Sequence, residues 1–243
     1  MKKLMIAVAA LTAGFAMADV VSSDIVGYAQ NGLQNGATLV TPQFLGINTT
    51  GGVVDLQSIK CSDGSSDLVF AQTVDSIGLT VDMYGWVDYG GDSGDELCWL
   101  DMNTMEKAEG VTIAPGQALW VQGDSTDNIL TSAGKVGTAD VSVQLKNGAT
   151  LAGNPTPVAI DLQDIVCNDG CSDLVFMQTV DEIGLTVDMY GWVDYGGDSG
   201  DELCWLDMNT MEKAEGVVIQ PGQGLWIQGD NDEQYVTFPA VEL

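Results

Sequence analysis

The sequence predicts an all-β protein built from two tandem, near-identical small β-sandwich or β-barrel domains with short helical turns. The main observation is an internal repeat: Asp67–Asp124 aligns without a gap with Asp173–Asp230, with six differences in 58 positions. The second observation is that short β-prone runs alternate with glycine and proline turns in both copies. Two copies of one unit predict two similar domains, and any site in the shared stretch is then expected twice.

The first 18 residues are typical of a signal peptide. Lys2 and Lys3 precede a short apolar run, Leu4–Ala13, and Ala16-Met17-Ala18 forms a small-x-small cleavage site. The apolar run is too short to span a bilayer. We therefore expect an exported protein that is periplasmic, cell-surface or extracellular, with no insertion into a membrane.

The repeat continues more weakly on either side of the shared stretch. Asn35–Leu39 corresponds to Asn147–Leu151. The first domain is therefore predicted over residues 19–135 and the second over residues 136–243. The segment that joins them, Ser132–Val136, is too short to act as a free tether, so the domains should touch.

Within each copy, strands are predicted from β-prone runs bounded by turn residues. In the first copy they are Leu68–Val74, Leu79–Tyr84, Trp86–Tyr89, Gly110–Ala114 and Gln117–Gln122. Val54–Ile59 and Ala159–Ile165 place Leu and Ile three apart, which predicts one short helical turn in each copy. Asp101–Ala108 fits either a further turn or a hairpin loop.

Charge and missing residue types exclude several functions. The chain has 35 acidic residues, seven basic residues and no His, and all seven basic residues are Lys. Loss of the leader with its two lysines takes the net charge from −28 to −30. Nucleic acid and anionic lipid are poor partners for such a surface. Without His or Arg the chain has no Ser-His-Asp triad, no Cys-His pair, no His-ligated zinc and no arginine clamp. We expect no enzyme, although composition leaves a carboxylate-pair glycosidase open.

The cysteines repeat with the domains. Cys61 and Cys98 correspond to Cys167 and Cys204. In an exported protein this favours the disulfides Cys61–Cys98 and Cys167–Cys204. Cys171 is left over, and it can pair with Cys167, bridge to a second chain or remain a buried thiol.

Acidic, glycine-containing segments flank these cysteines, and the proposed disulfides would bring them together. Hard carboxylate ligands on loops suit calcium, so each domain is predicted to bind Ca²⁺. The alternative is a set of turn-forming aspartates in solvent. The predicted ligands are Asp63, Asp67, Asp92, Asp95 and Glu96 in the first copy and Asp169, Asp173, Asp198, Asp201 and Glu202 in the second.

Each copy also carries three tryptophans. Sugar-binding modules stack rings on exposed aromatic side chains, and a small β core uses the same residues as filling. Trp120 and Trp226 follow a Pro-Gly-Gln turn and are expected in the core. The aromatic residues beside the acidic loops are the candidates for stacking, namely Trp86, Tyr89, Trp192 and Tyr195.

Several short motifs carry a resemblance. Asp24–Tyr28 soon after a leader, then Asn35–Phe44, Gly148–Pro155 and Pro221–Trp226, resemble motifs of uncharacterised exported β-rich repeat proteins of the Verrucomicrobia–Lentisphaerae group of bacteria. The resemblance implies a β-rich exported module and implies no activity. The acidic loops are not part of these motifs, and Cys171 is a departure.

Two functions follow as hypotheses. The first is an exported, non-enzymatic, acidic structural or adhesive module at the cell surface, stabilised by calcium, with other copies of itself or cell-surface components as partners. The second is a module that binds a glycan or another small ligand through exposed aromatic rings.

Overall fold

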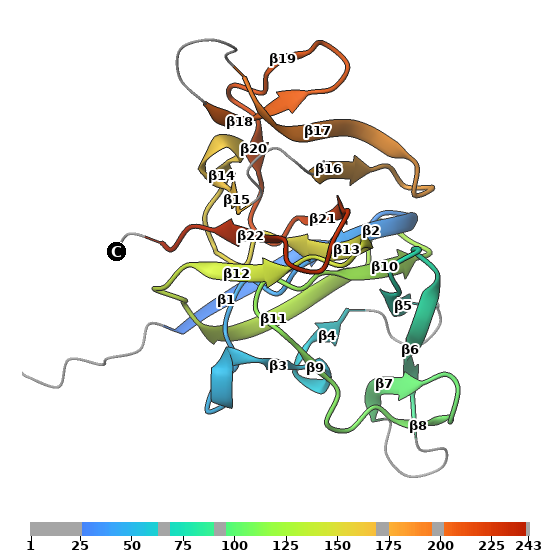
Figure 1. Ribbon diagram of the computed structural model, residues 1–243. Helices are drawn as coiled ribbons and strands as arrows, with labels where there is room; N and C mark the ends of the chain where they lie inside the picture. The colour runs from blue at the N-terminus through green and yellow to red at the C-terminus, as the bar shows by residue number, and fades with distance from the viewer. Residues whose placement is uncertain (1–25, 63–68, 90–95, 169–174, 196–201, 242–243) are drawn as a thin grey trace, which may run out of the picture.

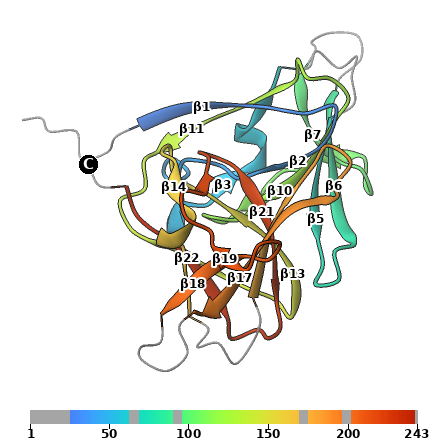
Figure 2. The ribbon, with the colours of Figure 1, turned by 90° about the horizontal axis from the view of Figure 1, so that it is seen from above.

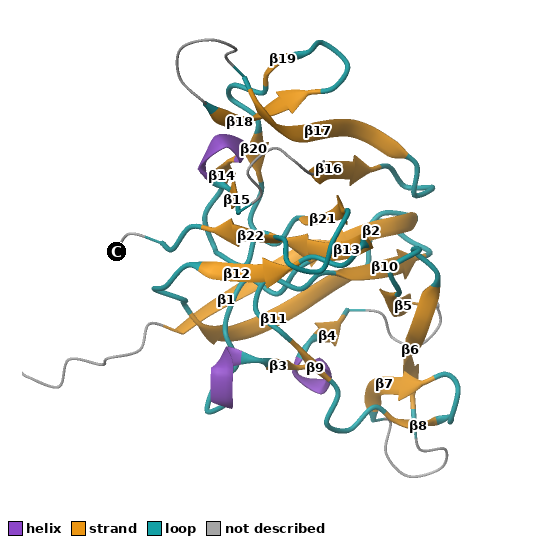
Figure 3. Cartoon of the chain, viewed as in Figure 1, coloured by secondary structure: helices purple, strands orange, loops and turns teal. Residues whose placement is uncertain are grey.

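The protein is all-β in every part that the computed structural model describes, which covers residues 26–62, 69–89, 96–168, 175–195 and 202–241. Antiparallel strands make up nearly all of its regular structure (Figure 3). Helix in these residues is limited to three 3₁₀ turns, η1 (Thr50–Gly52), η2 (Leu56–Ser58) and η3 (Leu162–Asp164). The predicted all-β class is confirmed, and the predicted signal peptide lies outside the described residues.

The first half of the chain forms three sheets. The largest contains, in spatial order, β2 (Gly36–Val40), β10 (Leu119–Gly123), β5 (Val69–Val74), β6 (Thr80–Asp88), β7 (Leu97–Asp101) and β8 (Glu106–Lys107). A three-stranded sheet has the order β1 (Val26–Gly32), β11 (Ile129–Lys135) and β4 (Lys60–Cys61). The third pairs β3 (Val54–Asp55) with β9 (Thr112–Ile113).

The second half repeats this arrangement. Its largest sheet contains β13 (Gly148–Gly153), β21 (Gly224–Gly229), β16 (Val175–Val180), β17 (Thr186–Asp194), β18 (Leu203–Asp207) and β19 (Glu212–Lys213). The smaller sheets are β12 (Val141–Gln144), β22 (Tyr235–Phe238) and β15 (Val166–Cys167), then β14 (Ile160–Asp161) and β20 (Val218–Ile219). Equivalent strands thus occupy equivalent places, while the division into two independent domains stays a prediction.

Each half buries its own apolar core around a tryptophan pair. In the first half Trp86 and Trp99 are cross-strand partners with ring centroids 5.3 Å apart. The indole N–H of Trp99 donates to the carbonyl oxygen of Ile59 at 2.8 Å, so its one polar group is satisfied inside the core. Trp192 and Trp205 repeat the pair in the second half, at 5.2 Å.

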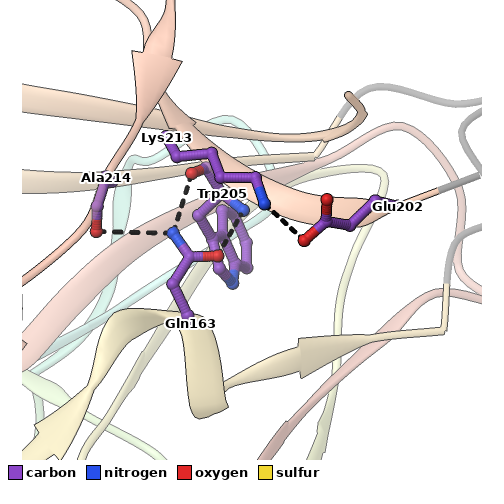
Figure 4. A network of polar contacts seen from close by, with 5 residues as sticks. All are labelled: Gln163, Glu202, Trp205, Lys213 and Ala214. Carbon is purple, nitrogen blue, oxygen red and sulfur yellow. Dashed lines mark hydrogen bonds and ion pairs between the residues drawn. The ribbon is translucent and has the colours of Figure 1, made fainter. Parts of the chain in front are cut away.

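The two short helical turns predicted from Leu and Ile spacing are present as η2 and η3, and each fastens a core strand. In η3, Gln163 accepts from the amide of Trp205 at 3.1 Å and donates to its carbonyl oxygen at 2.9 Å (Figure 4). Asp161 caps the same turn by accepting from the amide of Gln163. Gln57 and Trp99 make the same two contacts in the first half.

The strands β2, β10, β13 and β21 lie in the middle of the molecule, with β7 and β8 at one end and β18 and β19 at the other (Figures 1 and 2). The halves are in contact, as the short joint predicted. That joint is placed wrongly, however, because Ser132–Lys135 belongs to β11 and pairs with β1. The alternating burial of Leu130, Ser132 and Gly134 keeps the chain extended there.

Candidate functional site: a cleft between the repeats

The two halves meet through backbone hydrogen bonds that come in matched pairs. The amide of Ala37 donates to the carbonyl oxygen of Glu182 at 2.6 Å, and the amide of Ala149 donates to that of Ser76 at 2.6 Å. Ala37 and Ala149 hold equivalent positions in the repeat, as do Ser76 and Glu182. Each half thus offers the same groups to the other, which is the property of a two-fold, isologous interface.

A second matched pair lies further along the edge strands β2 and β13. Thr41 donates its amide hydrogen to Gly222 at 2.8 Å, and the equivalent Gly153 donates to Gly116 at 2.9 Å. An edge strand leaves one row of backbone groups without partners in its own sheet. The opposite half satisfies part of this row, so the interface covers two sheet edges.

The cleft between the halves is lined by the face of each large sheet that points away from its own core. Ala71 is buried in the core, and the next residue, Gln72, lies directly opposite Trp120 on the neighbouring strand. Successive side chains of a strand point to opposite faces, so Gln72 and Trp120 share the outer face. Gln178 and Trp226 are the equivalent pair in the second half.

Trp120 and Trp226 meet in this cleft. Their ring centroids are 6.1 Å apart and their planes are inclined by 77°, an edge-to-face contact. Each ring also packs on a glycine of the other half: a Cβ on Gly184 would lie 2.4 Å from Trp120, and one on Gly78 would lie 2.4 Å from Trp226. Both glycines have φ near +80°, so backbone conformation and ring contact each exclude a side chain.

A cavity of about 440 Å³ opens between the two indoles and two hairpins, β5–β6 in the first half and β16–β17 in the second. Its walls are formed by Gln72, Val74, Gly78, Thr80, Trp120, Gln178, Val180, Gly184, Thr186, Trp226 and Gln228. The hydroxyl of Thr80 donates to Oε1 of Gln72 at 2.7 Å, and that of Thr186 donates to Oε1 of Gln178 at 2.8 Å. These bonds orient both amides, and neither Nε2 donates a hydrogen bond within the part of the chain that the structure describes.

Two further cavities flank the cleft at equivalent places. One, of about 730 Å³, lies beside Pro115, and the other, of about 480 Å³, lies beside Pro221. Their linings differ in charge. Lys146 lines the larger cavity and donates to the carbonyl oxygen of Val74 at 3.1 Å, whereas the equivalent residue of the other cavity is Gln34.

The tryptophans that were predicted to be exposed for stacking are in fact buried. Trp86 is 2% exposed and Trp192 is 4% exposed, each packed in a core. The prediction was wrong because Trp86 has the same parity along β6 as the core residue Tyr84, despite its position near an acidic loop. Trp120 and Trp226, which were predicted for the core, are partly buried and pack against a third apolar cluster, formed by Leu39, Ala118 and Leu151 between the halves. Their remaining exposed surface faces the cleft.

The tyrosines predicted for stacking are accessible. Tyr89 is 42% exposed and Tyr195 is 44% exposed. The ammonium of Lys107 lies over the ring of Tyr89 at 5.4 Å, and that of Lys213 lies over Tyr195 at 5.8 Å. A lysine therefore already occupies one face of each ring, which leaves less room there for a stacked ligand.

The two predicted disulfides are not formed in the structure. Cys98 is a buried thiol opposite Val87, one residue out of step with the Trp86–Trp99 pair. Its side chain therefore leaves the sheet on the face opposite the core, whereas Cys61 packs within the core. Cys204 is a buried thiol in the equivalent place, and Cys171 lies outside the described residues. Burial raises the pKa of the Cys98 and Cys204 thiols.

Most of the predicted calcium ligands lie outside the described residues: Asp63, Asp67, Asp92, Asp95, Asp169, Asp173, Asp198 and Asp201. The two that the structure places, Glu96 and Glu202, each form an ion pair. Lys107 donates to Glu96 at 2.5 Å, and this hydrogen bond holds the pKa of that carboxyl below its ordinary value. Lys213 donates to Glu202 in the same way (Figure 4).

Among the described residues, no three Cys, Asp or Glu side chains come together to hold a metal ion. No helix in those residues is long and apolar enough to cross a bilayer. No protein-family model, curated protein or solved structure matches the chain. We therefore infer function from the geometry of the described residues.

Sequence reasoning missed the cleft residues, although a signal for them exists. In Leu119-Trp-Val-Gln122 every second residue faces the core, and Leu119 and Val121 are the buried ones. Trp120 shares its parity with the polar Gln122, which places it on the outer face. This alternation predicts that Trp120 lies on the outer face of its sheet. It does not predict that the outer faces of the two halves lie opposite each other and form a cleft.

Proposed function

We propose that the protein is an exported, non-enzymatic structural or adhesive module at the cell surface. The observation that carries the proposal is a row of exposed apolar side chains on each hairpin at the rim of the cleft. Ile77 is 75% exposed and Ile183 is 71% exposed, and Leu79 and Leu185 beside them are each 61% exposed. Apolar side chains gathered at an exposed rim are typical of an interaction surface.

Cell-surface components are the partner that we favour for these hairpins. A chain with a net charge of −30 after loss of its leader repels other copies of itself, so self-association is the second choice. The absence of His and Arg from the chain supports a role without catalysis, because the usual acyl- and phosphoryl-transfer sites need these residues.

The test is retention of the purified protein on envelopes of the cells that make it. A variant with Ile77→Ser, Leu79→Ser, Ile183→Ser and Leu185→Ser should sediment with the envelopes several-fold less than the wild type. A control with Val26→Ser and Val158→Ser, two exposed valines away from the hairpins, should be retained normally. Equal retention of all three proteins would reject the hairpins as the contact surface, and sedimentation velocity separates envelope binding from self-association.

Calcium remains part of the proposal. Its support is the number of carboxylates in the acidic segments and the charge that a divalent cation would relieve. Bound calcium should raise the midpoint of thermal unfolding. When free calcium is a hundredfold above its dissociation constant, the folded state should be stabilised by about 2.7 kcal/mol. Asp95→Ala with Asp201→Ala should abolish the rise. An unchanged midpoint in millimolar calcium would show that these acids are only solvated turns.

The second candidate function is binding of a glycan or another small ligand. The residues predicted for it at Trp86 and Trp192 are buried, so they do not support it. The cleft between the repeats does, because it combines two partly exposed indoles with oriented amides.

A further inference from the structure

We propose that the cleft between the repeats is a single binding site for a neutral, hydroxyl-rich ligand of the saccharide class. Adhesion through the apolar hairpins does not require such a ligand, so the two proposals can fail separately. The cavity of about 440 Å³ is within the range of small-ligand sites, about 300–1,000 Å³.

Charge favours a neutral ligand. The residues that line the cavity are Gln, Thr, Trp, Val and Gly, with no charged side chain among them. The acidic chain as a whole repels anions. A cationic ligand would find no carboxylate to pair with among these lining residues.

The polar groups match hydroxyls. Thr80 and Thr186 each use their hydrogen to hold a glutamine, which leaves the hydroxyl oxygens as acceptors. Among the described residues, the Nε2 groups of Gln72 and Gln178 have no acceptor. A sugar hydroxyl both donates and accepts, so it can pair with a threonine oxygen and an amide hydrogen together.

The aromatic groups are preorganised. Trp120 and Trp226 are held by each other and by the glycine turns of the opposite half, so no ring has to be ordered when a ligand arrives. A rigid site loses less conformational entropy on binding. The exposed parts of two indoles supply the apolar surface on which the C–H faces of a sugar ring can pack.

The symmetry of the site fixes the stoichiometry. The Gln72–Trp120 pair and the Gln178–Trp226 pair line one cavity. One chain should therefore bind one ligand, even though every group in the site occurs twice in the sequence. This is the feature that separates a shared cleft from two independent sites, one on each repeat.

The experiment is titration calorimetry of the full mature chain with four neutral probes: maltohexaose, cellohexaose, mannohexaose and N-acetylchitohexaose. Polygalacturonate and chitosan hexamer serve as the anionic and cationic comparators. We expect saturable binding of at least one neutral probe with one ligand per chain, and weaker or no binding of both comparators. Absence of binding by all four neutral probes at about 10 mM, or two ligands per chain, would overturn the proposal.

Variants locate the binding. Trp120→Ala alone should weaken binding of the neutral probe by about tenfold or more at the only site, because that site needs both indoles. Two independent sites would instead lose one ligand per chain and keep the affinity of the other. Tyr89→Ala with Tyr195→Ala is the matched control outside the cleft and should bind normally; unchanged binding by Trp120→Ala would contradict the proposal.

Two conservative variants keep the test decisive if Trp120→Ala does not fold. Trp120→Phe keeps an aromatic ring, and Gln72→Leu with Gln178→Leu removes the amide donors without changing charge. Both variants should bind the neutral probe more weakly, while their far-UV circular dichroism spectra stay those of the wild type. Wild-type affinity in the glutamine variant would show that the amides do not hold the ligand and would overturn the assignment.

Discussion

The two repeats build the same sheets around cores that are filled differently. In the second half Met177 and Ile227 are cross-strand partners, and both are fully buried. The same pair in the first half is Ala71 and Val121, also fully buried. These two differences in the shared stretch are therefore at touching positions, which shows that one backbone accommodates two sets of side chains when neighbours change together.

A third difference leaves a mark on the first half. Phe238 is fully buried in the second half, and Ser132 is its equivalent. The hydroxyl of Ser132 is buried without a hydrogen-bond partner in the described residues, next to a cavity of about 10 Å³. The first half thus has a small void beside the residue that corresponds to Phe238.

The interface shows why near-identical repeats must still differ. Ala118 and Gly224 are equivalent residues, and a Cβ on Gly224 would lie 3.0 Å from the Cβ of Ala118. It would also lie 2.8 Å from the carbonyl carbon of Leu39. Equivalent residues that meet across a two-fold axis compete for the same space, so one of these two residues is a glycine.

The largest loss of stability should come from making a cavity in the core of the second half. Met177→Ala should lower the free energy of unfolding by about 2–5 kcal/mol, because it leaves a cavity at a site with no exposed surface. Urea unfolding of the variant measures this. A loss no larger than that of a surface substitution, about 0.5 kcal/mol, would show that the second core does not depend on this side chain.

A smaller effect is expected at the two-fold axis. Gly224→Ala should destabilise the protein by about 1–3 kcal/mol, since the new methyl group meets the backbone of Leu39 and the side chain of Ala118. Adding Ala118→Gly removes one of these clashes and should recover part of the loss. Thermal unfolding of the single and double variants is the measurement. Full stability of Gly224→Ala would mean that the halves are not packed as closely as described.

Ser132→Ala should stabilise the first half by about 1 kcal/mol, because it removes a buried hydroxyl without a partner. The matched control is Ser142→Ala, whose exposed hydroxyl shares a hydrogen bond with Thr237 and whose loss should change stability little. The midpoint of thermal unfolding distinguishes the two. A destabilised Ser132→Ala would mean that the hydroxyl has a partner in solution.

The smallest effect concerns pH. The hydrogen bond from Lys107 lowers the pKa of Glu96 in the folded state, so the pair stabilises the fold at pH values above the ordinary value of 4.5. That contribution should fade as the pH falls below 4.5 and through the folded pKa. Glu96→Gln should therefore have a slightly lower unfolding midpoint than the wild type at pH 7, and this difference should shrink steadily as the pH falls below 4.5. A difference that does not change with pH would assign the effect to packing.

Much of the fold follows from local sequence patterns. The β-prone runs, the glycine turns and the Leu and Ile spacing predicted strands and two helical turns close to where the structure has them. The sheet face on which some side chains lie was predicted wrongly. The acidic loop beside Trp86 and the repeated spacing of Cys98 do not reveal the face of either side chain, because their positions along β6 and β7 decide which face they occupy.

The cleft could not be predicted in the same way. Trp120 and Trp226 lie far apart in the sequence, and nothing in either strand shows that they meet. Their contact depends on how two finished sheets pack, which is a property of the interface. The repeated sequence predicts two sites, whereas the packing of the repeats brings both tryptophans into one cleft.

Reciprocal contacts of the edge strands hold the two repeats together. Hydrogen exchange at the amides of Ala37, Thr41, Ala149 and Gly153 tests this most directly, because each donates across the interface. All four should exchange slowly, and Gly224→Ala should speed all four together while amides inside β6 and β17 keep their protection. Fast exchange of these four amides in the wild type, as fast as in an exposed loop, would contradict the account.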